Sequence, residues 1–195
     1  MTLITTAIAQ VIFYAVFITW LAFTFLIERI IVGNESKGTA RTREDRESAL
    51  LIYLSVFVSL IVAFEFAGAG ITPLPDWLFI VGIFLMLLGI FVREWAVTTL
   101  GGYYSFRVRV REDHKVIESG AYRLVRHPAY SGSILTMVGI GFAVQSSAAV
   151  LILLVFCGIA YGYRIRVEET ALLKDLGGEY SKYMSRTKRL IPFIF

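Results

Sequence analysis

Five long apolar runs dominate the sequence and restrict the folds that it can adopt. A helix that crosses the hydrocarbon core of a membrane needs about 20 mostly apolar residues. Hydrophobic residues make up 57% of the 195 residues and charged residues only 17%, unlike the composition of a soluble domain. We therefore expect an all-α integral membrane protein, a single membrane domain over 1–195, with five transmembrane helices. The runs that meet or approach the required length are 4–31, 49–71, 77–100, 128–145 and 148–168.

The positions of the basic residues predict how the chain crosses the membrane. Lysines and arginines follow the first, third and fifth runs, whereas the short connections at 72–76 and 145–147 contain none. The positive-inside rule then places the N-terminus outside the cell membrane and the C-terminus in the cytoplasm. The segments 101–127 and 169–195 should form a cytoplasmic cap and a helical tail. The net charge of +4 comes from these connections, so we expect no nucleic-acid partner.

Two further charged parts of the sequence are open to interpretation. The connection 33–47 mixes charges of both signs and is typical of a solvated loop. Glu65 falls within the second apolar run, which we place across the membrane with Glu65 near its middle. A carboxylate inside a membrane is costly and usually functional, but the sequence does not say what role Glu65 has.

The stretch "RHPAY" at 126–130 predicts where the fourth helix begins. Proline disfavours the helical conformation at the residue before it and fits the first helical turn, so the helix should start at Pro128 with His127 at its cap. A helical hairpin about the turn 145–147 then brings position 127 opposite position 165.

The second polar motif, "YRIRVEE", therefore reaches the same membrane depth as "RHPAY". Arg164 and Glu168 are four residues apart and face one side of their helix. An exposed ion pair is one interpretation of this spacing, but polar groups so close to the hydrocarbon favour a functional site. His114 and His127 lack the cysteine and carboxylate spacing of a metal site, so we expect no metal.

The two segments "DHKVIESGAYRLVRHPAYSG" and "RIRVEETALLKDLGGEYSKYMSRTKRLIPFI" together resemble the isoprenylcysteine carboxyl methyltransferase family and related phospholipid-methyltransferase-like membrane proteins. The resemblance implies S-adenosylmethionine as cofactor, S-adenosylhomocysteine as product and a lipophilic acceptor that enters from the bilayer. It implies a catalytic role at the acceptor for Arg164 and leaves the role of Glu169 open. The cofactor-binding positions that it implies are His114, Lys115, Val116, Ile117, Tyr122, His127, Pro128, Ala129, Tyr130 and Glu168.

The identity of the acceptor stays open at this point. A carboxylate acceptor needs a cation such as Arg164 and no general base, which favours carboxyl methylation. A phospholipid amine would need deprotonation, for which Glu168 or Glu169 are candidates. A reductase that uses NADPH is a weaker alternative, because such membrane reductases are about twice as long. A non-enzymatic lipid-binding bundle should carry polar residues in several spans, where only Glu65 fits.

Overall fold

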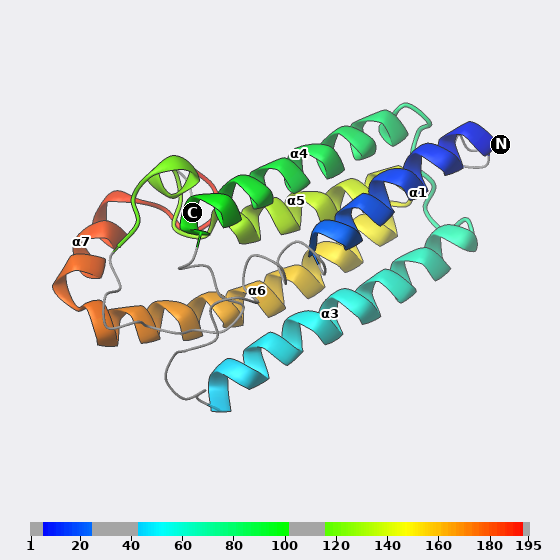
Figure 1. Ribbon diagram of the computed structural model, residues 1–195. Helices are drawn as coiled ribbons and strands as arrows, with labels where there is room; N and C mark the ends of the chain where they lie inside the picture. Colours follow the sequence, from blue (N-terminus) through cyan, green and yellow to red (C-terminus); the bar gives the residue numbers. More distant parts are fainter. Residues whose placement is uncertain (1–5, 25–42, 102–115, 193–195) are drawn as a thin grey trace.

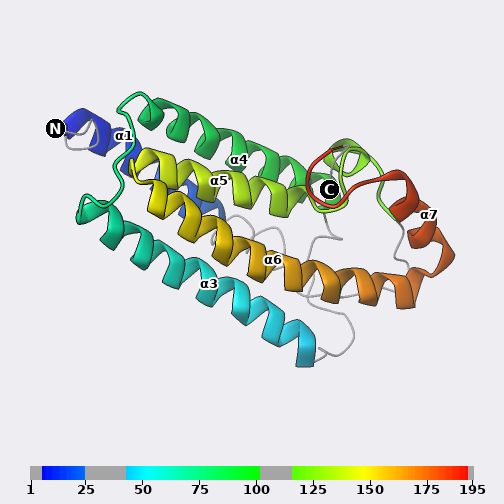
Figure 2. The same ribbon diagram turned by 180° about the vertical axis from the view of Figure 1, so that it is seen from behind.

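The computed structural model of the protein describes residues 6–24, 43–101 and 116–192, and over these ranges its regular structure is helical. Helices α1, α3, α4, α5 and α6 run along one another in a bundle (Figures 1 and 2). Helix α7 and the short helix η4 lie together at one end of the bundle, and α1 begins at the other (Figure 1). The helices are α1 (Ala7–Ala22), α3 (Arg43–Gly68), α4 (Leu78–Leu100), η4 (Gly120–Arg123), α5 (Pro128–Ala143), α6 (Ser147–Leu176) and α7 (Gly178–Arg186).

Within the described ranges, three helices are long and apolar enough to cross a membrane. These are α3, α4 and α6, whereas α1 and α5 are apolar but have 16 residues each. Large apolar side chains point away from the bundle, among them Phe57, Phe84 and Ile159, each more than 60% exposed. Such a surface suits contact with lipid rather than with water. Five membrane crossings remain a prediction.

Glycines bring α4 and α5 into close contact and so fix how near α5 lies to α4. A Cβ atom added at Gly132 would lie 2.6 Å from the carbonyl oxygen of Gly89, and one added at Gly139 would lie 2.7 Å from that of Gly82. Small residues at such positions let two membrane helices pack backbone against backbone. Arg93 of α4 reinforces this contact, since its Nη1 atom donates to Ser133 Oγ of α5 at 2.5 Å.

The predicted hairpin between α5 and α6 is confirmed. Gln145 takes a left-handed φ of +56° in the turn, and the Ser146 hydroxyl caps the first turn of α6. The turn also packs on the connection between α3 and α4, where Leu74 N–H donates to the Gln145 carbonyl at 2.9 Å. At the other end of the hairpin α6 continues without a break to Leu176, and Gly177, with φ of +53°, ends it.

The predicted position of Glu65 is wrong. Helix α3 ends at Gly68, so Glu65 lies in its last turn, and its side chain is exposed. The second apolar run extends to residue 71 only because Ile71 and the small residues before it continue the apolar composition after the helix has ended. Glu65 is therefore at the end of the bundle opposite to α7 (Figure 1).

Candidate functional site

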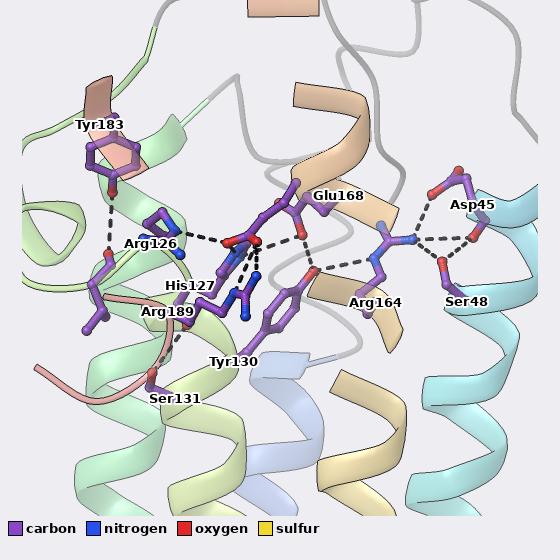
Figure 3. Close-up of polar contacts among 12 residues, drawn as sticks. Asp45, Ser48, Arg126, His127, Tyr130, Ser131, Arg164, Glu168, Tyr183 and Arg189 are labelled. Atoms are coloured by element: carbon purple, nitrogen blue, oxygen red, sulfur yellow. Dashed lines mark hydrogen bonds and ion pairs between the residues drawn. The ribbon is translucent and has the colours of Figure 1, made fainter. Parts of the chain in front are cut away.

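The start of α5 lies against the C-terminal tail. Pro128 is the first residue of α5, as predicted, and His127 precedes it in a non-helical conformation. The backbone N–H groups of Arg126 and His127 donate to the carbonyls of Lys188 and Arg189, at 2.8 and 3.0 Å. The tail thus satisfies backbone donors in front of the helix and holds the side chain of Arg189 at the site (Figure 3).

Glu169 of α6 is the centre of a charge cluster that joins the start of α5, α6 and the tail. Its Oε1 atom accepts from Arg126 Nε at 2.9 Å and lies 3.3 Å from His127 Nε2. Its Oε2 atom accepts from Arg189 Nε and Nη2 at 3.1 and 2.9 Å. A buried carboxylate needs compensation of this kind, so Glu169 holds three elements together.

Tyr130 links the cluster to the second polar motif of α6. Its hydroxyl donates to Glu168 Oε2 at 2.7 Å and accepts from Arg164 Nε at 3.4 Å. Its ring stacks on that of His127, with centroids 5.6 Å apart, and lies 5.1 Å from that of Tyr161. The predicted meeting of "RHPAY" with "RIRVEE" is therefore confirmed, with Arg164 and Glu168 on one face of α6.

Arg164 also contacts the first turns of α3. Its Nη1 atom donates to Asp45 Oδ1 at 2.7 Å and to Ser48 Oγ at 2.8 Å. All three residues are at most 2% exposed. The interpretation of 33–47 as a solvated loop is thus wrong at its end, where the chain is already helical and Asp45 is buried by packing against α6.

Of the other predicted cofactor-binding residues, Tyr122, Pro128 and Ala129 lie close to these contacts. Tyr122 of η4 is buried, and its carbonyl accepts from the Tyr183 hydroxyl at 2.6 Å. Pro128 and Ala129 are buried in the first turn of α5, and Ala129 belongs to the same buried apolar cluster as Tyr122. The remaining four positions precede η4: Val116 and Ile117 are half-buried, and His114 and Lys115 lie outside the described residues.

Burial and one ion pair determine the protonation states of Tyr180, Tyr183 and Arg189 in α7 and the tail. Burial raises the pKa of the Tyr180 and Tyr183 phenols above their usual value, so both stay protonated at neutral pH and Tyr183 remains a donor. The hydrogen bonds to Glu169 raise the pKa of the Arg189 guanidinium, because they stabilise its charged form.

The exposure of the charged side chains indicates which of them a ligand can reach. The side chains of Glu168 and Arg189 are 29% and 39% exposed. Those of Arg126, His127 and Glu169 are at most 8% exposed. A reachable carboxylate and a reachable guanidinium on either side of the His127–Glu169 pair suit a ligand that carries both an ammonium and a carboxylate group.

Reasoning from the sequence missed five residues of this site. Arg126 and Arg189 were used only to predict topology, although Arg126 directly precedes the His-Pro pair. Tyr183 is one of several aromatic residues in an amphipathic segment, and nothing in the sequence distinguishes it. Asp45 and Ser48 were missed because they lie 119 and 116 residues from Arg164 in the chain.

Comparisons with known proteins support the resemblance found in the sequence. The profile of the Isoprenylcysteine carboxyl methyltransferase (ICMT) family matches residues 80–174. Protein-S-isoprenylcysteine O-methyltransferase B of Arabidopsis thaliana is 28% identical over 120 residues, 60% of this chain and 61% of that protein. Protein-S-isoprenylcysteine O-methyltransferase of Saccharomyces cerevisiae is 30% identical over 117 residues, 59% of this chain and 49% of that protein.

The fold also matches a solved structure. A eukaryotic intramembrane Ras methyltransferase, ICMT, superposes with a TM-score of 0.63 over 92% of this chain and 67% of that chain, at 21% identity. The chain therefore shares the fold of that structure, and its residues 80–174 match the profile of the family. The sequence match spans about three fifths of the length of the Arabidopsis relative and about half of the length of the yeast relative.

Proposed function

We propose that this chain, which carries the sequence of the isoprenylcysteine carboxyl methyltransferase family over residues 80–174, is a membrane methyltransferase. It uses S-adenosylmethionine to methylate a carboxylate on a lipophilic acceptor, such as that of an isoprenylcysteine. One observation carries the proposal: the Tyr130 hydroxyl joins the carboxylate of Glu168 to the guanidinium of Arg164 at the end of the α5–α6 hairpin.

The reachable charges fit the amino-acid part of the cofactor. Glu168 can bind the ammonium group or the ribose hydroxyls, and Arg189 can bind the carboxylate. Tyr130 and Tyr122 provide aromatic surface for the adenine or the sulfonium. The family resemblance adds the positions His114, Lys115, Val116, Ile117, His127, Pro128 and Ala129.

Arg164 is the residue that we assign to the acceptor. S-adenosylmethionine, when bound, would supply a sulfonium methyl group to an oxygen of the acceptor carboxylate, with S-adenosylhomocysteine as the leaving group that keeps the electron pair of the C–S bond. The carboxylate is already ionised at neutral pH, so the protein does not have to remove a proton. Arg164 holds and orients this carboxylate. Its side chain is only 3% exposed and already paired with Asp45, so the acceptor reaches it by displacing that partner, and burial of the site excludes water.

The same assignment predicts where the reaction takes place. The starts of α3 and α5 and the second half of α6, which carry the charged residues of the site, lie toward the end of the bundle that carries α7 (Figure 1). With the topology expected from the basic residues, this end faces the cytoplasm, from which the cofactor enters. The acceptor approaches from the bilayer between the helices.

Two readouts on purified protein test the proposal. Calorimetry measures binding of S-adenosylhomocysteine, and transfer of a labelled methyl group is measured to an S-prenylated N-acetylcysteine and, separately, to phosphatidylethanolamine. Glu168→Gln should weaken binding about tenfold, since it removes one charged contact. Arg164→Lys should lower transfer at least tenfold and change binding less than twofold, because lysine keeps the charge but loses the planar geometry of arginine.

The control is Glu118→Gln, which removes an exposed carboxylate outside the site and should change neither readout. Transfer to phosphatidylethanolamine alone would contradict the carboxylate acceptor. An equal loss of binding in the Glu168 and Arg164 variants would contradict the division of roles.

A further inference from the structure

Arg164 already holds a carboxylate that belongs to the chain itself. Asp45 Oδ1 lies 2.7 Å from Arg164 Nη1, and the Asp45 carbonyl lies 3.3 Å from the same atom. The two side chains are 2% and 3% exposed, so this is a buried ion pair rather than a surface contact. Ser48, one turn further along α3, donates to the Asp45 carbonyl at 3.0 Å and accepts from Arg164 at 2.8 Å (Figure 3).

The pair joins an element that lies outside the residues matched by the family profile to the reaction site. Helix α3 precedes the matched residues 80–174 and packs along α6. On α6, Arg164 is held from two sides, by Asp45 and Ser48 through Nη1 and by the Tyr130 hydroxyl through Nε. A guanidinium held at both ends has little rotamer freedom, so these contacts determine where it meets an acceptor.

The charge of Asp45 has a second consequence. An acceptor carboxylate that binds Arg164 must approach within a few ångströms of the Asp45 carboxylate, and two like charges at such a distance in a buried place repel each other. The acceptor therefore competes with Asp45 for the guanidinium. A neutral acceptor group could not replace Asp45 as the ion-pair partner of Arg164.

We propose that Asp45 is a positioning residue for Arg164 and an internal competitor of the acceptor carboxylate, so that the first turns of α3 form part of the acceptor site. This inference rests on the proposed function. Asp45 keeps Arg164 aligned when no acceptor is present and gives way to the carboxylate when it binds. The KM for the acceptor, rather than the affinity for the cofactor, reflects this competition.

The first test is Asp45→Asn in the full-length protein. Asparagine keeps an oxygen that accepts from Arg164 but removes the charge, so Arg164 stays aligned and the competition is lost. The KM for an S-prenylated N-acetylcysteine should fall by about fivefold or more, with kcat changed less than threefold. The Kd for S-adenosylhomocysteine should change less than twofold. Asp175→Asn, which removes an exposed carboxylate near the end of α6, is the matched control and should leave all three unchanged.

The second test is Ser48→Asp. It tests the same inference if the Asp45→Asn variant does not fold. It places another carboxylate next to Arg164 Nη1 and should raise the KM about fivefold or more. An unchanged or higher KM in Asp45→Asn, or an unchanged KM in Ser48→Asp, overturns the inference while wild-type transfer upholds the proposed function. A wild-type protein that transfers no methyl group refutes the proposed function, and the inference with it.

Discussion

Neutralising Glu169 should destabilise the protein even though glutamine keeps the shape of the side chain. Glu169→Gln removes the charge that compensates Arg126, whose side chain is 8% exposed. Breaking a buried ion pair by removing one partner costs roughly 3–5 kcal/mol, whereas the contact with the more exposed Arg189 contributes about 0–1 kcal/mol. The glutamine oxygen still accepts one N–H, and Arg126 keeps its bonds to the carbonyls of Met184 and Thr187. We therefore expect a loss of about 2–4 kcal/mol in the free energy of unfolding.

Equilibrium unfolding of the purified protein in detergent, with increasing denaturing surfactant, measures this loss. Glu118→Gln is a control of the same chemistry, because it breaks an arginine–glutamate pair of 2.8 Å whose side chains are 62% and 41% exposed. That variant should lose less than about 0.5 kcal/mol. Equal losses in the two variants would refute the reasoning, since burial is the difference between the two pairs.

Two other changes test the packing around the site in the same unfolding assay. Tyr183→Phe removes the donor to the buried Tyr122 carbonyl and should lower the free energy of unfolding by about 1–2 kcal/mol. An unchanged free energy of unfolding would mean that this hydrogen bond does not stabilise the fold. Gly132→Ala puts a Cβ atom 2.6 Å from the backbone of α4 and should cost about 1–3 kcal/mol, whereas Gly158→Ala, with nothing within 4 Å, should cost nothing. Equal effects of the two alanines would contradict the close packing of α4 on α5.

The sequence predicts the α5–α6 hairpin and its meeting motifs because local chemistry determines them. Pro128 starts a helix by its own backbone geometry, and the polar turn before Ser147 limits the register of the two helices to a small range. Helical spacing then puts Arg164 and Glu168 on one face, and the structure has both on the hydroxyl of Tyr130.

The partners of Arg164 and of the start of α5 could not be predicted in this way. Asp45 lies in a segment of mixed charge, where nothing local distinguishes a buried carboxylate from a solvated one. Its burial depends on how α3 packs along α6. The path of the tail past Arg126 is likewise a tertiary contact between residues about 60 positions apart, formed by backbone hydrogen bonds that no side-chain pattern encodes.

Calorimetric titration of S-adenosylhomocysteine into the detergent-purified protein tests the central claim most directly. The proposed site predicts micromolar binding that Glu168→Gln weakens about tenfold and that Glu118→Gln leaves unchanged. Folded protein that binds no S-adenosylhomocysteine, or that binds it equally well in both variants, would contradict the assignment of this site to the methyl donor.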